Sequence, residues 1–170
     1  MTSSLIETAP AIEPFDPLID NAYDIAQTHL SIRRWQEAVG QNSFSNIYES
    51  QADLMGLETY YIEPGGNFFV ARDIATQRAI GFVGLRNDGE GIGKIKRLAV
   101  EPPYQRKGIG RALTSKVIDW ATSNDFSKLT LQTHYFENAA PLYEEFGFTI
   151  EGFDRDRFDC LMELELGKAS

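Results

Sequence analysis

The chain has 170 residues, of which 42% are hydrophobic and 24% charged, as expected for one globular domain that buries its own core. The net charge of −9 argues against binding to nucleic acids, because their phosphate backbone would be repelled. The single cysteine, Cys160, excludes a disulfide within the chain and predicts a cytoplasmic protein, and no apolar run approaches the roughly 20 residues of a membrane span.

The N-terminal part is expected to consist of a flexible segment, a strand and a long helix. Residues 1–10 lack the basic start and apolar middle of a secretory signal, and a single domain is expected to cover residues 11–166. Residues 11–15 are typical of a short strand. Apolar residues at spacings of three and four then predict a helix that begins at Pro17, with Asp16 as its N-cap.

The middle of the chain is expected to contain a short helix and a set of strands. The helix is predicted over residues 50–57. Strands are predicted over residues 68–71, 79–86 and 92–100, with a hairpin loop over residues 87–91. Successive strands joined by short turns favour an antiparallel meander.

The last part of the chain alternates helices and strands. Helices are predicted over residues 108–123 and 138–146, and strands over residues 129–133, 148–150 and 157–166. The order strand, helix, strand over residues 92–133 indicates a βαβ unit with parallel strands. The fold class is therefore α/β of the α+β type, with a mixed, mostly antiparallel central sheet, a βαβ core and flanking helices.

Positive charge is concentrated between Lys94 and Lys116. Seven basic residues in this stretch accompany a single acid, Glu101, which gives a net charge of +6. One basic region in an otherwise acidic protein suggests a compact anionic ligand. A solvated charged face would give the same pattern, so charge alone does not decide between the two interpretations.

The centre of this basic stretch is the segment Gln105-Arg106-Lys107-Gly108-Ile109-Gly110-Arg111, which leads from a strand into a helix. The free N–H groups of a helix start, two glycines that allow close approach and three basic side chains together predict a pyrophosphate site. The Walker pattern and GxGxxG are both absent, which disfavours ATP, GTP and a Rossmann dinucleotide. A glycine-rich helix start without any ligand is the structural alternative.

Two motifs in this order and spacing resemble those of a known family. The segment Gln105-x-x-Gly108-x-Gly110, after a strand, resembles motif A of the GNAT acetyltransferases, and residues 137–148 resemble motif B of that family. The resemblance covers residues 68–153, whereas residues 16–64 match only in their coarse helical layout. It implies a GNAT-like acyltransferase fold with acetyl-CoA as co-substrate.

The resemblance also implies roles for individual residues. The loop and helix start would hold the coenzyme A pyrophosphate, the strand Leu98-Ala99-Val100 would pair with the pantetheine arm, and Asn138 would contact a pantetheine amide. In the family, a bulge separates this strand from the next one and an N–H group there stabilises the oxyanion. The residues assigned to the cofactor are Leu98, Ala99, Val100, Gln105, Arg106, Lys107, Gly108, Ile109, Gly110, Arg111 and Asn138.

The resemblance implies that Tyr143 is the acid that protonates the leaving thiolate, although a packing role on its helix is the alternative. The general base stays open: His134 is the first candidate, Glu137 and Glu101 are weaker ones, and a water relay would serve as well. Some family members carry a glutamate just before the Leu98 segment, where this chain has Lys96-Arg97.

A covalent route through Cys160 is disfavoured, because no histidine neighbours it and a buried structural thiol is expected. No metal site is expected either, since the two histidines are far apart and HExxH is absent. The acetyl group would therefore pass directly to the acceptor in a ternary complex.

The function that these observations favour is transfer of an acetyl group from acetyl-CoA to a primary amine of a small molecule or peptide. The acidic remainder of the chain favours a cationic acceptor. A non-catalytic acyl-CoA sensor with the same fold is the alternative, and a small phosphate-binding or DNA-associated module is a more distant one. The C-terminal strands would leave an exposed edge, which makes a homodimer possible.

Overall fold

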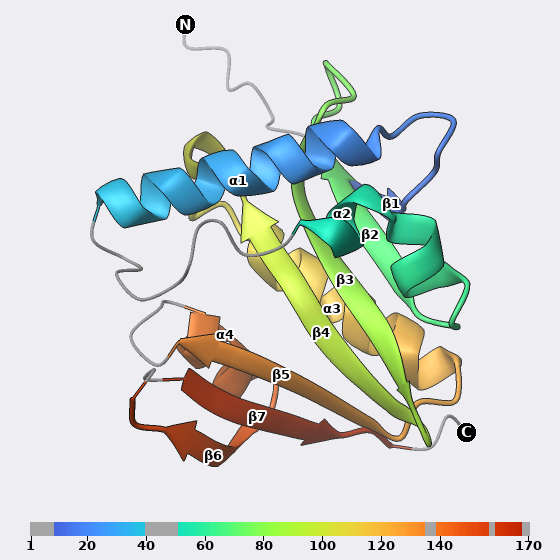
Figure 1. Ribbon diagram of the computed structural model, residues 1–170, viewed down its shortest axis with the longest axis vertical. Coiled ribbons are helices and arrows are strands. Elements are labelled where there is room, and N and C mark those ends of the chain that lie inside the picture. The colour runs from blue at the N-terminus through green and yellow to red at the C-terminus, as the bar shows by residue number, and fades with distance from the viewer. Residues whose placement is uncertain (1–8, 40–50, 135–138, 157–158, 168–170) are drawn as a thin grey trace, which may run out of the picture.

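The computed structural model describes residues 9–39, 51–134, 139–156 and 159–167. Its strands form one seven-stranded sheet in the order β1-β2-β3-β4-β5-β7-β6 (Figure 1). The strands are β1 (Ala11–Pro14), β2 (Asn67–Arg72), β3 (Ala79–Gly89), β4 (Ile92–Val100), β5 (Lys128–His134), β6 (Thr149–Asp154) and β7 (Asp159–Glu165). The helices are α1 (Ala22–Ala38), α2 (Ala52–Met55), a π-helical turn (Glu58–Ile62), a 3-10 turn (Pro102–Tyr104), α3 (Ile109–Ser123) and α4 (Ala139–Glu145).

Helices cover both faces of the sheet, and each face has its own hydrophobic core. One core packs α3 and α4 against the sheet through residues such as Leu113, Val117 and Tyr143. The other packs α1, α2 and the π-helical turn against β2 and β3, with Ile25 and Leu54 at its centre. Figure 1 shows α1 and α2 on one side of the sheet and α3 on the other.

The strand pairing confirms the predicted fold class. β2, β3 and β4 form an antiparallel meander, and β4 and β5, which α3 connects, are parallel. The remaining pairs, β1 with β2, β5 with β7 and β6 with β7, are antiparallel. The sheet is therefore mixed and mostly antiparallel around a βαβ core.

The start of the first helix was predicted wrongly. The helix begins at Ala22, and the side chain of Asn21 caps it by accepting hydrogen bonds from the amides of Tyr23 (2.9 Å) and Asp24 (3.4 Å). Asp16 instead begins a separate turn, which ends at Asp20. The fully buried guanidinium of Arg72 binds Asp20, and this pairing holds the turn away from the helix.

Two other boundaries also differ from the prediction. The helix predicted over residues 50–57 consists of the short α2 followed by the π-helical turn, and Ser50 lies outside the described residues. The hairpin loop predicted over residues 87–91 is a two-residue turn, because Glu90 and Gly91 both have positive φ (54° and 76°) and so allow β3 to continue to Gly89.

Candidate functional site

The central feature is the separation of β4 from β5 in the middle of the sheet. Their parallel pairing is confined to Ile92, Gly93 and Lys94, opposite residues 128–130 of β5. Beyond Lys94, β4 continues to Val100 with partners on β3 but, in the described part of the chain, none on β5. One side of residues 95–100 therefore presents backbone hydrogen-bonding groups to a gap inside the sheet.

A β-bulge lies in the separated part of β4. Lys96 pairs with Gly84 and Ala99 pairs with Phe82, so that Arg97 and Leu98 share one residue of β3. Arg97 has a left-handed backbone with φ 62°, which an arginine rarely adopts. The bulge predicted from the family resemblance is thus present, and it turns the end of β4 away from β5.

The predicted loop leads from β4 into α3. Gly108 occupies the N-cap position with φ 82°, and the first amide bonded back to it is that of Ala112, which donates to the Gly108 carbonyl over 3.0 Å. Helix geometry leaves the amides of Ile109, Gly110 and Arg111 without a partner inside the helix. A Cβ built on Gly108 would meet no described atom within 4 Å, so the surface at the N-cap itself is open.

The other residues of the loop have distinct positions. The side chain of Gln105 donates a hydrogen bond to the Val100 carbonyl over 2.9 Å and so joins the loop to the end of β4. Arg106 has φ 64°, which turns the chain before Gly108. Arg111, in the first turn of α3, is exposed and forms an ion pair with Glu145 at the end of α4.

The catalytic candidates lie on the elements beside this loop. Tyr143 is on α4, is 4% exposed, and packs edge-on against Phe148 with ring centroids 5.5 Å apart. The backbone of His134 ends β5 opposite Asp159, but its side chain lies outside the described part, as do Asn138 and Glu137. Glu101 forms an ion pair with Arg78 through two hydrogen bonds of 2.5 and 2.8 Å, which weakens its candidacy as a base.

The bulge is tied to α2 by a buried polar cluster that the sequence analysis missed. Asp53, which is 6% exposed, accepts hydrogen bonds from the Tyr61 hydroxyl (2.6 Å) and from Nε and Nη2 of Arg97 (3.0 and 2.8 Å). Burial acts to raise the pKa of Asp53, but the hydrogen bonds from Arg97 and Tyr61 outweigh it and the pKa is lowered. Asp53 is therefore a carboxylate that holds the bulge, which makes it unsuitable as a proton acceptor at neutral pH.

A second buried titratable group, His29, lies on α1 against the same face of the sheet. Its Nδ1 lies 3.2 Å from Oε1 of Gln51, and its ring is 6.1 Å from that of Phe82, the strand partner of Ala99. The pKa of His29 is lowered to about 4, mainly by burial and then by the positive charge of Arg97. The imidazole is therefore neutral at physiological pH.

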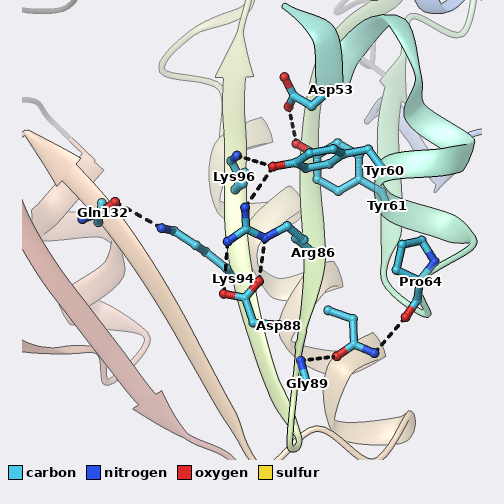
Figure 2. Close-up of polar contacts among 11 residues, drawn as sticks. Asp53, Tyr60, Tyr61, Pro64, Arg86, Asp88, Gly89, Lys94, Lys96 and Gln132 are labelled. Carbon is cyan, nitrogen blue, oxygen red and sulfur yellow. Dashed lines mark hydrogen bonds and ion pairs between the residues drawn. The ribbon is translucent and has the colours of Figure 1, made fainter. Parts of the chain in front are cut away.

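Beside this cluster lie three basic side chains of β3 and β4, two of which bond to the hydroxyl of Tyr60. Nζ of Lys96 and Nη1 of Arg86 donate to that hydroxyl over 3.0 and 2.9 Å. Nζ of Lys94 reaches across to Oε1 of Gln132 on β5 over 3.1 Å. Figure 2 shows Lys96 and Arg86 pointing to the Tyr60 hydroxyl from neighbouring strands, with Lys94 turned toward Gln132.

The basic residues that form one stretch in the sequence thus lie in two separate places in the structure. Lys94, Lys96 and Arg97 are on β4 and bond to residues of α2, the π-helical turn and β5. Arg106 and Arg111 are at the loop and the start of α3, beyond the end of β4. The alternation Lys94-Ile95-Lys96 was the available signal, since residues two apart in a strand share a face and Ile95 is in the core.

Other features of the described residues bear on the chemistry. Cys160 is fully buried on β7 and burial raises the pKa of its thiol, in agreement with the expected structural role. No three or more His, Cys, Asp and Glu side chains in the described ranges are arranged to hold a metal ion. Within those ranges, no helix combines the length and apolar character needed to cross a membrane. A cavity of about 340 Å³ lies elsewhere, between the start of α1 and the turn at Gln77 and Arg78.

The chain is similar in sequence to several acetyltransferases. N-acetylaspartate synthetase of Xenopus tropicalis is 35% identical over 101 residues, which are 58% of this chain but only 36% of that protein, so the chain spans well under half of that relative. IAA acetyltransferase of Azospirillum brasilense is 30% identical over 127 residues, 71% of this chain and 82% of that protein.

A solved structure has the same fold. The PaiA N-acetyltransferase of Thermoplasma acidophilum, determined in complex with coenzyme A, superimposes with a TM-score of 0.72 over 93% of this chain and 99% of that one, at 19% identity. The model of the Acetyltransferase (GNAT) family matches residues 18–148. The match includes the separated strands, the bulge and the glycine loop, and the chain belongs to the GNAT acetyltransferase family.

Proposed function

We propose that the domain of residues 11–166 transfers an acetyl group from acetyl-CoA to a primary amine, which attacks directly in a ternary complex. The observation that carries the proposal is the open side of β4 between Lys94 and Val100, which leads directly to the open helix start at Gly108. A long, thin ligand matches these two features in this order, with its amide-containing arm along β4 and its pyrophosphate at the helix start.

The cofactor would lie along β4 and over the loop. The backbone of Leu98, Ala99 and Val100 would pair with the pantetheine amides as an added strand does. The amides from Arg106 to Arg111 would bind the pyrophosphate, with Arg106, Lys107 and Arg111 supplying positive charge. Gln105 would shape the loop through its bond to Val100. Asn138 is proposed as a further pantetheine contact.

During the transfer, residues of the chain would accept one proton, donate another and stabilise one developing negative charge. The amine nitrogen bonds to the thioester carbonyl carbon, the carbon–sulfur bond breaks, and the amine loses a proton while the thiolate gains one. A backbone N–H of Leu98 or Ala99, at the bulge, would stabilise the oxyanion. Tyr143 would protonate the thiolate, and His134, on β5 beside the gap, would take the proton of the amine directly or through water. These steps require no metal ion.

The relatives support an amine as acceptor, because the Xenopus protein is named for the synthesis of an N-acetylated amino acid. We also infer a cytoplasmic location, supported by the buried Cys160, the chain's single cysteine. Dimerisation through β6 is a further inference, because β6 is an edge strand that exposes Ile150 and Phe153 (42% and 46%).

The first test measures release of coenzyme A thiol from acetyl-CoA with a panel of primary amines, against a blank without amine. Release that depends on an amine, with one acetylated product formed per thiol, is the expected result. If acetyl-CoA raises the unfolding temperature but no amine causes release, the acyl-CoA sensor replaces the transferase. If acetyl-CoA neither protects nor reacts, the assignment of the loop is wrong as well.

A further inference from the structure

The three basic side chains Arg86, Lys94 and Lys96 are not needed for the cofactor in the arrangement proposed above. They lie on β3 and β4 between the last residue paired with β5, Lys94, and the bulge at Arg97. The pyrophosphate loop lies beyond the other end of β4, after Val100. The cluster is therefore beside the place where a thioester would meet its acceptor, if the cofactor lies as proposed.

The charges in this cluster are not balanced. Arg86 and Lys94 are direct cross-strand partners on β3 and β4, a pairing of like charges that destabilises a sheet. Lys96 follows two residues after Lys94 on the same face of β4. Arg86 has a carboxylate partner in Asp88, at 2.5 Å, but in the described part of the chain no carboxylate lies within 4 Å of the ammonium group of Lys94 or Lys96.

The polar neighbours of the two lysines accept a hydrogen bond without supplying a full negative charge. Lys94 bonds to the amide oxygen of Gln132, and Lys96 to the hydroxyl of Tyr60, whose ring centroid lies 5.0 Å from its Nζ. Burial, followed by repulsion from Arg86 and Lys96, lowers the pKa of Lys94. The bond from Lys96 is the main reason why the pKa of Tyr60 is lowered. The neighbouring positive charges contribute to both shifts, after burial in the case of Lys94.

We propose that Arg86, Lys94 and Lys96 bind a carboxylate of the acceptor, so that the preferred substrate is an amine that also carries acidic groups, such as an acidic amino acid. This inference rests on the proposed function. It replaces the expectation of a cationic acceptor, which was based on the acidic remainder of the chain, because the side chains beside the gap are basic. An acceptor carboxylate would balance the lysines, and its amino group would lie toward the bulge.

The test compares three acceptors of similar size: aspartate, its dimethyl ester and the cationic amine putrescine. We expect acetylation of aspartate at a KM at least tenfold below that of the dimethyl ester, with putrescine the poorest substrate. Lys94→Gln and Lys96→Gln keep a hydrogen-bonding group but remove the charge. Each should raise the KM for aspartate roughly tenfold, the effect of losing one charged hydrogen bond, with little change for the ester.

The matched control is Lys116→Gln, which removes an exposed lysine from α3 on the other side of the sheet. Its KM for aspartate should be unchanged. The KM for acetyl-CoA should be unchanged in all three variants. If Lys94→Gln or Lys96→Gln weakens acetyl-CoA binding in place of aspartate binding, the lysines bind a cofactor phosphate and the proposal is overturned.

Failure of the inference can be separated from failure of the proposed function. If other amines are acetylated but aspartate is not preferred, the transferase stands and the carboxylate site is wrong. If no amine reacts, binding of succinate, which has the carboxylates but no amine, tests the site alone by calorimetry. Succinate binding that is lost in the Lys94→Gln/Lys96→Gln double variant but kept in Lys116→Gln would support the site, and equal binding by all would overturn it.

Discussion

Arg97, the bulge residue of β4, donates hydrogen bonds of 3.0 and 2.8 Å to the carboxylate of Asp53 on α2. The guanidinium side chain is 12% exposed and the carboxylate side chain 5%. This contact joins a strained backbone position to the helical layer above it. The bulge and α2 should therefore be lost together.

Asp53→Asn tests this contact. Removing the carboxylate charge takes away a counter-ion that binds the Arg97 guanidinium through two hydrogen bonds, and the free energy of unfolding should fall by about 3 kcal/mol or more. Urea denaturation gives the value directly. Glu145→Gln breaks the exposed pair with Arg111 and should change stability by less than about 1 kcal/mol. Equal effects from both variants would show that the buried pair does not hold the bulge.

The buried His29 predicts a dependence of stability on pH. Its pKa of about 4 in the folded protein lies below the ordinary 6.5, so the unfolded chain binds more protons between these two values. Stability should be full above pH 6.5 and should decrease by at most about 3 kcal/mol as the pH falls toward 4. Denaturation curves at a series of pH values measure this loss.

His29→Gln should flatten the decrease between pH 6.5 and 4.5, whereas His134→Gln serves as the comparison for the other histidine. The Asp53 carboxylate does not interfere in this range, because its lowered pKa places its own loss of stability at more acidic pH. A decrease that persists unchanged in His29→Gln would assign the pH dependence to other groups.

Gly108→Ala should weaken acetyl-CoA binding at least tenfold. The added methyl group meets no described atom within 4 Å in the free protein, so any effect on binding beyond backbone strain comes from the ligand that approaches the loop. Gly89→Ala is a closely matched control, because Gly89 has φ 87° against 82° for Gly108 and is equally open. Both variants should lose about 1 kcal/mol of stability, since both force alanine into the left-handed region. Calorimetric titration with acetyl-CoA should then show weakened binding in Gly108→Ala and unchanged binding in Gly89→Ala.

Tyr143→Phe should lower kcat by roughly 10²-fold and leave the affinity for acetyl-CoA unchanged, because only the acidic hydroxyl is removed. The ring still packs against Phe148, so the unfolding temperature should change little. Tyr23→Phe, at an exposed position on α1, should retain full activity. An unchanged kcat in Tyr143→Phe would leave Tyr143 as a packing residue of the core.

The sequence predicted those parts of the fold whose signals are local. The periodic apolar residues and Gly108 predicted α3. Gly147, two residues beyond the end of α4, has φ 96°, as a helix-ending glycine should. The strand β4 was predicted with its observed bounds. These elements depend on residues close together in the chain.

The errors arose where a distant residue decides the local structure. Arg72, far along the chain, fixes Asp20 and so delays the start of α1 beyond the predicted Pro17. The hydrogen bonds between Arg97 and Asp53 likewise join two segments that are far apart in the sequence, and no local pattern predicts this contact. The basic residues could be counted from the sequence. Their division between β4 and the loop depends on contacts of β4 with α2, the π-helical turn and β5, which are distant in the chain.

The separation of β4 from β5 gives the protein an open strand edge in the interior of its sheet. An open edge at the outside of a sheet invites another chain to pair with it and aggregate. Here β5, β7 and β6 stand on the far side of the gap, and another protein's strand would have to displace them to reach β4. The open part of β4 is therefore shielded by the rest of its own sheet from edge-to-edge pairing with other proteins.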